Sequence, residues 1–418
     1  MTKLLTKQSL SWALYDWANS AYATIVMAVF FQLLFSNYWY TDNGNTTTPL
    51  GIANAIGSLV IVLIAPILGA IADRGGLKKN LLFIFAVTGI LFTFTLYFIG
   101  EGQWLLALSI YVLAGIGFAG ANVFYDAMLV DVAHKDKIDL TSALGFSLGY
   151  LAGGITLIIA ALFTQKMEWF GFTSIQQAQL ATFIMVAIWW LLFTIPILIN
   201  VKEQKTVTTV PLNRAIKEGF QQLATTFREI RQLKTVFLFL AAYWLYIDGV
   251  DTIIRMAIDY GKRLNFDDTN LMYAFLITQF IGFPAALLYG KLGERIGAKR
   301  AILIAIGVYI GVTIYGYRMD NVSEFYVLAF VVGLVQGGIQ SLSRSFYIRL
   351  IPANKMTEFF GFYNMLGKLA AVLGPLLMAL VSQMTGSPRL AILSIAILFI
   401  LGGGLLVFVK PEKAPTII

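Results

Sequence analysis

The sequence has 418 residues and a net charge of +8; 58% of its residues are hydrophobic and only 12% are charged. A soluble domain carries about 25% charged residues. This composition and a mean hydropathy of +0.78 therefore exclude an ordinary soluble protein and indicate a polytopic membrane protein. The absence of cysteine excludes disulfides, thiolate metal sites and cysteine nucleophiles.

Apolar stretches long enough to cross a bilayer recur along the whole chain. A transmembrane helix needs about 20 mostly apolar residues. The sequence predicts twelve such helices, over residues 9–36, 49–71, 80–99, 104–129, 140–163, 178–200, 235–259, 269–290, 300–317, 324–349, 357–382 and 389–409. The first stretch is too long for the core of a signal peptide, and no small-residue cleavage site follows it, so we expect a retained helix.

Basic residues between the predicted helices fall mainly on one side of the membrane. An even number of helices places both termini on the same side, and the segments on that side hold 22 Lys and Arg residues against 5 in the opposite loops. Loops rich in Lys and Arg stay in the cytoplasm. We therefore predict cytoplasmic termini and a bacterial inner membrane protein. The positive net charge reflects topology, so we expect the lipid bilayer and no nucleic acid as a partner.

The longest predicted loop separates two halves of the chain. Apolar residues recur in it at spacings of three and four: Leu212, Ile216, Phe220, Leu223, Phe227 and Ile230. This pattern predicts an amphipathic helix on the cytoplasmic leaflet, which also serves as a linker. We divide the chain into a six-helix bundle over 1–201, the linker over 202–234 and a second six-helix bundle over 235–418.

A charged motif occurs once in each half, at an offset of 221 residues. GAIADRGGLKK (Gly69–Lys79) and GKLGERIGAKR (Gly290–Arg300) both fit G-x-[LI]-x-[DE]-R-x-G-x-K-[KR]. The first glycine permits close helix approach, and the acid can meet the N-terminus of a helix from the opposite half. A merely solvated charged turn is the alternative. The predicted gating residues are Gly69, Asp73, Arg74, Gly76, Gly290, Glu294, Arg295 and Gly297.

The repeated motif resembles the loop signature of the major facilitator superfamily. Four further stretches resemble the branch that includes the autophagy-associated vacuolar amino-acid effluxers of fungi: LYDWANSAYATIV, LGFSLGYLAGG, GGIQSLSRSFYIRLIP and FFGFYNMLGK. The resemblance implies an all-α membrane protein with twelve transmembrane helices in two pseudo-symmetric six-helix bundles that alternate their access. It also implies efflux of amino acids or related small solutes.

Ionisable residues inside the predicted spans avoid the helices that this family places outermost. The third, sixth, ninth and twelfth spans carry no Asp, Glu, Lys or Arg in their interiors, as expected because charge facing lipid is unfavourable. The predicted residues for substrate binding or proton coupling lie in the other spans: Asp16, Asn19, Asn122, Asp126, Tyr150, Asp248, Asp251, Arg255, Gln279, Gln336, Gln340, Arg344, Asn364 and Lys368.

Spacing assigns some of these residues to shared faces. Asp248, Asp251 and Arg255 lie on one stripe of a helix, and Asp251 and Arg255 can pair along it. Aligning the two halves at an offset of 218 residues places Asp126 opposite Arg344. We therefore predict an ion pair between the bundles that closes the cytoplasmic side in the outward-open state.

The acids are candidates for binding a substrate ammonium group or carrying a coupling proton. Arg255, Arg344 and Lys368 are candidates for a substrate carboxylate or phosphate, since Arg offers two parallel donors. The alternative is that these charges only neutralise one another and lock conformational states. Depth in the membrane favours a gating role for Asp16 and a binding role for Asp248, Asp251 and Arg255.

The sequence thus predicts a monomeric, proton-coupled secondary transporter that exports an amino acid or short peptide. The alternatives are an exporter of amphipathic compounds or lysolipids, and a non-coupled receptor or scramblase. GIGFAG (Gly115–Gly120) formally matches a nucleotide-binding pattern, but it lies inside an apolar span and no P-loop occurs. We therefore expect no cofactor, no metal and no enzymatic activity.

Overall fold

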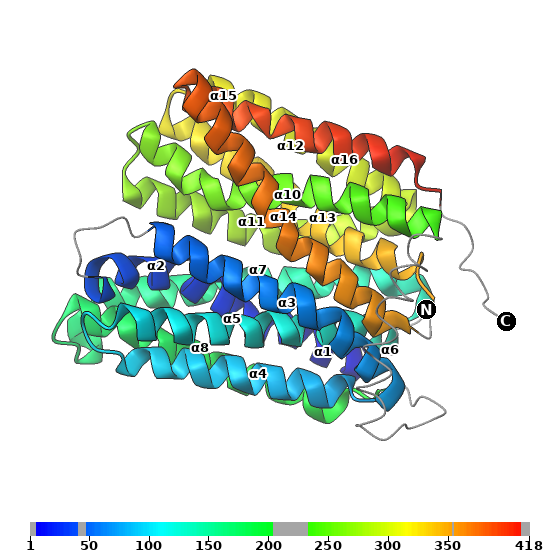
Figure 1. Cartoon of the computed structure of the whole chain (residues 1–418), viewed down its shortest axis with the longest axis horizontal. Helices are drawn as coiled ribbons and strands as arrows, with labels where there is room; N and C mark the ends of the chain where they lie inside the picture. The colour runs from blue at the N-terminus through cyan, green and yellow to red at the C-terminus, as the bar shows by residue number, and fades with distance from the viewer. Residues whose placement is uncertain (1–5, 41–46, 204–232, 353–354, 411–418) are drawn as a thin grey trace.

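The computed structural model describes residues 6–40, 47–203, 233–352 and 355–410, and nearly all of them are helical (Figure 1). The amphipathic helix predicted within 202–234 lies almost wholly outside the described residues.

The N-terminal bundle contains six long helical spans. The first begins as α1 (Lys7–Ala21), continues as a π-helical segment, η1 (Tyr22–Phe30), and ends with α2 (Phe31–Leu34) and η2 (Phe35–Trp39). The others are listed in chain order: α3 (Thr47–Gly75), α4 (Lys78–Thr95) with its 3-10 extension η3 (Leu96–Phe98), α5 (Trp104–Ala127), α7 (Ile138–Gln165) and α8 (Ile175–Asn200). Short elements connect them: α6 (Leu129–Val132), η4 (Lys135–Lys137) and η5 (Met167–Phe170).

The C-terminal bundle repeats this plan. Its spans are α10 (Lys234–Arg263), α11 (Asp268–Ile296), α12 (Ala298–Arg318), α13 (Val322–Ile348), α14 (Met356–Thr385) and α15 (Pro388–Ser394) continued by α16 (Ala396–Phe408). Across the described residues, 11 helices are long and apolar enough to cross a membrane, and the 30-residue α14 is the twelfth span. Each predicted span coincides with one of them to within a few residues, so the all-helical fold is confirmed.

Local sequence signals account for where several helices begin and end. Asn321 and Glu324 form a reciprocal capping box at the start of α13. Ser387 caps α15, with a proline at its first position. Gly76 and Gly297 of the repeated motif have φ values of 59° and 89°, a left-handed backbone that favours glycine. These two glycines therefore allow one span to end and the next to begin without a longer loop.

The two bundles lie side by side, and the start of α1 and the end of α16 are at the same end of the molecule (Figure 1). We call this the terminal end and the other the far end. Contacts between the bundles run mainly along two helix pairs, α3 with α14 and α7 with α11. Large apolar side chains are exposed along α4, α8 and α16, for example Leu91, Leu192 and Ile400, which suits a surface in contact with lipid rather than water.

The membrane orientation can be tested with single cysteines because the chain has none of its own. Lys135 lies exposed in η4 at the terminal end, and Trp169 is exposed in the connection between α7 and α8 at the far end. With cytoplasmic termini, a membrane-impermeant maleimide should label Trp169→Cys on intact cells and label Lys135→Cys only after lysis. If only Lys135→Cys were labelled on intact cells, the topology would be the opposite of the predicted one.

Candidate functional site

The guanidinium of Arg344, on α13, lies buried between the two bundles. Its Nη1 is 2.9 Å from Asp126 Oδ1 of α5, and its Nη2 is 3.8 Å from Asp16 Oδ2 of α1. Its Nε donates to the Ser142 hydroxyl and its Nη2 to the Ser142 carbonyl, both at 2.9 Å. The ion pair that the alignment of the two halves predicts between Asp126 and Arg344 is therefore present.

Aromatic rings surround this guanidinium. Its Cζ lies 4.8 Å from the Trp12 ring, 5.3 Å from the Tyr125 ring and 4.5 Å from the Phe146 ring. Such contacts attract a cation to the faces of the rings. The Tyr125 hydroxyl also donates to Asp16 Oδ2 at 2.7 Å. The rings exclude water from the ion pairs, and this exclusion strengthens the electrostatic attraction within the cluster.

A fifth helix completes the cluster. Asn364 of α14 donates to the second oxygen of Asp126 at 3.0 Å. We call Arg344, Asp16, Asp126, Ser142 and Asn364 the Arg344 cluster. Because two of its helices belong to the C-terminal bundle and three to the N-terminal bundle, the cluster exists only while the bundles touch at this level.

The first copy of the charged motif meets a helix N-terminus, as the sequence predicts. Asp73, at the end of α3, accepts hydrogen bonds from the Thr357 amide at 3.1 Å, the Thr357 hydroxyl at 2.5 Å and the Glu358 amide at 2.9 Å. These groups form the first turn of α14, where a negative charge is stabilised. A Cβ on Gly69 would lie 2.7 Å from the Thr357 carbonyl carbon, so this approach requires the predicted glycine.

The second copy makes a different contact. Glu294 pairs with the Lys137 ammonium group at 2.9 Å, so it meets a side chain at the start of α7 rather than the backbone amides that the sequence predicts. A Cβ on Gly290 would lie 2.6 Å from the Ala143 Cβ, which again explains the glycine. Arg295 is exposed. The side chain of Arg74 lies outside the described residues.

Asp139 is a part of this interface that the sequence analysis missed. It lies in the first turn of α7 and is 1% exposed. Its Oδ1 accepts from the Ser345 hydroxyl at 2.5 Å, and its Oδ2 is 2.9 Å from Arg349 Nη2. The sequence places Asp139 just outside a predicted span, and an acid there, close to Lys135 and Lys137, is typical of a solvated loop. Only the packing of α13 against α7 shows that it is buried.

Other predicted polar residues form hydrogen bonds nearer the middle of the molecule. Within the N-terminal bundle, the Asn19 amide donates to Asn122 at 2.7 Å. Between the bundles, the Tyr150 hydroxyl donates to the Gln340 carbonyl oxygen at 2.9 Å. These bonds join α1 to α5 and α7 to α13 and keep the polar side chains away from lipid.

Two more predicted glutamines lie in the same region. Gln279 of α11 donates to the Thr24 hydroxyl at 3.3 Å, and Thr24 belongs to the π-helical segment of the first span, which the sequence does not predict. Gln336 is 8% exposed, and its carbonyl oxygen has no hydrogen-bond partner among the described residues. A buried acceptor without a partner is unfavourable, so this conformation leaves the Gln336 amide oxygen unsatisfied.

Asp251 and Arg255 lie four residues apart on α10. Asp251 acts electrostatically on Tyr150 of α7, and Arg255 acts on Tyr111 of α5. Asp251 is partly exposed and Arg255 is exposed. Two opposite charges thus lie one helical turn apart on α10. The side chain of Lys368 lies outside the described residues.

Asp248 turns away from these two residues and into its own bundle. It is fully buried and accepts from the Leu373 and Gly374 amides of α14 at 3.0 and 2.9 Å, and from the Thr252 hydroxyl at 3.2 Å. These amides directly precede Pro375, and a proline inside a helix interrupts its hydrogen-bond ladder. Asp248 therefore stabilises the interruption in α14 and does not share an open face with Asp251 and Arg255.

Comparison with known proteins places these features in a family. A family model described as "Vacuole effluxer Atg22 like" matches residues 38–139 and 131–416. An MFS-type transporter of Bacillus subtilis is 41% identical over 422 residues, covering 100% of this chain and 97% of the relative. The chain belongs to the Atg22-like branch of the major facilitator superfamily. The family that the motifs resemble is thereby confirmed, and the protein is a non-enzymatic integral membrane transporter.

More distant Atg22-like relatives and solved structures agree. Autophagy-related protein 22 of Yarrowia lipolytica is 26% identical, covering 85% of this chain and 74% of the relative. The human organic anion transporter MFSD10 superposes with a TM-score of 0.74 at 13% identity, covering 96% of this chain and 99% of that one. A proton:xylose symporter, XylE, gives a TM-score of 0.72 at 13% identity, with 97% and 96% covered. At this identity the two structures show the shared fold alone.

Replacing Arg344 should open the terminal end. Arg344→Gln leaves two buried carboxylates without their cation, and such a loss costs about 3–5 kcal/mol. A conformation in which water reaches the carboxylates avoids this cost. In a Ser341→Cys background, where the buried Ser341 lies next to Ser142, we expect maleimide labelling to speed up by about tenfold or more, which needs only about 1.4 kcal/mol.

The matched control is Arg389→Gln, which removes an exposed ion pair with Asp320 at the far end. It should leave the labelling rate unchanged. Equal rates in the Arg344→Gln variant and its parent, with both proteins folded, would contradict the gating role of the cluster.

Replacing Asp248 should destabilise the C-terminal bundle. Asp248→Ala removes the acceptor of two backbone amides, and each buried amide left unpaired costs about 1–3 kcal/mol. Asp248→Asn retains one acceptor oxygen. We therefore expect the unfolding temperature to fall in the order wild type, Asp248→Asn, Asp248→Ala, and Thr252→Val to have a smaller effect than Asp248→Ala. An unchanged unfolding temperature in Asp248→Ala would show that the carboxylate does not stabilise α14.

Proposed function

We propose that the protein is a proton-coupled secondary transporter that exports a small zwitterionic solute, an amino acid or short peptide, by alternating access. It acts as a monomer in a bacterial inner membrane with both termini in the cytoplasm. The observation that carries this proposal is the Arg344 cluster, in which one guanidinium from one bundle holds two carboxylates of the other.

The distribution of bonds between the bundles supports alternating access. Hydrogen bonds and ion pairs join the bundles from Asp73–Thr357 at the terminal end to Thr24–Gln279 near the middle. This conformation is therefore closed at the terminal end. Access from that end requires the bundles to separate there, which breaks the Arg344 cluster and exposes its charges.

A zwitterion matches the charges that this separation releases. Its ammonium group can replace the guanidinium at Asp16 or Asp126, and its carboxylate can occupy Arg344 in two parallel hydrogen bonds. A proton on one carboxylate serves the same purpose when no solute is bound, because a neutral acid is less unfavourable in a dry environment. Substrate and proton then compete for the same carboxylates, which is a basis for coupling their movements.

Asp251 and Arg255 extend the path toward the far end. They offer an acid and a base from one helix, and the carbonyl oxygen of Gln336 adds an unpaired acceptor between the bundles. A solute released by the Arg344 cluster when the terminal end closes meets a second pair of opposite charges. The direction of export draws support from the family, whose model carries the word effluxer in its description.

Purified protein in liposomes tests the proposal. We expect uptake of at least one radiolabelled amino acid or dipeptide, and we expect a pH gradient to accelerate it. Asp251→Asn should reduce uptake by about tenfold or more, since loss of a charged hydrogen-bond partner costs about 1.5–3 kcal/mol. Asp320→Asn, which changes an exposed acid outside the site, should transport normally.

The other outcomes each contradict a part of the proposal. Uptake that is insensitive to the pH gradient would remove proton coupling. Movement of lysophospholipid with no movement of amino acids or dipeptides would replace the substrate class. Full activity in Asp251→Asn would remove this carboxylate from the substrate path.

A further inference from the structure

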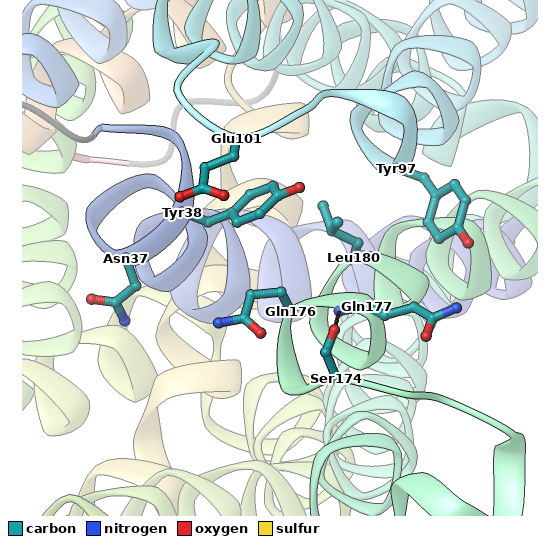
Figure 2. A pocket seen from close by; sticks show the side chains of 8 residues that line it. All are labelled: Asn37, Tyr38, Tyr97, Glu101, Ser174, Gln176, Gln177 and Leu180. Atoms are coloured by element: carbon teal, nitrogen blue, oxygen red, sulfur yellow. Dashed lines mark hydrogen bonds between the residues drawn. The ribbon is translucent and has the colours of Figure 1, made fainter.

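A polar cavity of about 500 Å³ lies at the far end of the N-terminal bundle (Figure 2). Its walls come from three parts of that bundle: Asn37 and Tyr38 at the end of the first span, Tyr97 and Glu101 at the end of α4 and in the turn after it, and Gln176 in the first turn of α8. All of its lining residues belong to one bundle. The cavity is therefore separate from the residues that join the two bundles.

Hydrogen bonds within the protein hold these walls in place. The amide of Gly102, next to Glu101, donates to the Tyr38 carbonyl at 3.2 Å, and the Trp39 indole donates to the Ile99 carbonyl at 3.2 Å. These bonds fix the turn that carries Glu101 against the end of the first span. The cavity thus has a preformed shape, and its volume falls within the range of about 300–1,000 Å³ that is typical of ligand sites.

The chemistry of the lining favours a cation. Glu101 is the one acidic side chain among the lining residues, and no basic side chain accompanies it. Figure 2 shows its carboxylate beside Tyr38, with Asn37 and Gln176 on the same side of the cavity. In the described part of the chain, no hydrogen bond or ion pair engages the side chains of Asn37, Glu101 or Gln176, so their oxygen atoms are available to a donor.

We propose that this cavity binds a primary ammonium group. Glu101 supplies the opposite charge, the amide oxygens of Asn37 and Gln176 accept the remaining N–H groups, and the ring of Tyr38 supplies a face that attracts a cation. The ammonium group comes from a soluble amine or from the headgroup of a lipid in the adjacent leaflet. Phe98 and Ile175, which are next in sequence to Tyr97 and Gln176, are 64% and 47% exposed, and such exposed apolar side chains suit contact with lipid beside the cavity.

The first experiment measures binding by the purified full-length protein. Ethanolamine should raise the unfolding temperature in a saturable manner, whereas ethylene glycol, which has the same size without the amine, should not. Glu101→Gln should raise the half-saturating ethanolamine concentration by about fivefold or more, because the carboxylate supplies the charge-assisted bond. Glu168→Gln, an exposed glutamate of η5 outside the cavity, should behave as wild type. Gln176→Leu, a second variant that keeps Glu101, should weaken the response to a smaller extent.

The second experiment distinguishes the two sources of the ammonium group. Native mass spectrometry of protein from nanodiscs that contain phosphatidylethanolamine should show retained lipid that Glu101→Gln loses if the lipid is the ligand. Retention that is equal in both proteins, together with a Glu101-dependent response to ethanolamine, assigns the site to a soluble amine. Equal ethanolamine responses in wild type, Glu101→Gln and Glu168→Gln overturn the proposal.

Discussion

The buried guanidinium of Arg344 is the constraint around which the two bundles are arranged. An isolated charge in a low-dielectric interior is strongly unfavourable, and it is tolerated only when it is paired and its hydrogen bonds are satisfied. Here the partners, Asp126, Asp16 and Ser142, all belong to the other bundle. The free-energy cost of burying the charge is therefore offset only while the bundles touch. The stability of the buried Arg344 side chain thus depends on the position of one bundle relative to the other.

The two halves share a sequence plan but contribute opposite charges at equivalent positions. Asp126 and Arg344 are 218 residues apart, the offset that aligns their helices α5 and α13, and they meet each other at the terminal end. The charged motif diverges in a similar way, because Asp73 accepts from backbone amides whereas Glu294 pairs with Lys137. The duplicated framework sets where these side chains stand. Because the two copies carry different residues at equivalent positions, these positions can act as complementary partners.

The sequence predicts the parts of this structure that depend on periodicity and length. Twelve apolar spans, the repeated motif and the Asp126–Arg344 pair all follow from patterns within the chain or between its halves. Asp248 shows the limit of this reasoning, since helical spacing gives the face of a residue relative to its own helix but not which neighbour that face meets. Its partners are the Leu373 and Gly374 amides of another helix, next to Pro375. The burial of Asp139 is not predicted for the same reason, because it depends on packing against Ser345 of another helix.

The hydrogen bonds to α14 form two sets: those that must break when the terminal end opens, and those that can persist. Asp73 and Asp126 hold the part of α14 before the proline, at Thr357, Glu358 and Asn364. Asp248 holds its middle, next to Pro375, from within the same bundle. Opening the terminal end must break the first set of bonds, since they cross the boundary between bundles, whereas nothing requires the bond to Asp248 to break. The interrupted ladder before Pro375 is thus stabilised independently of the gate, and one helix can lose its partners at one end while it remains fixed to α10.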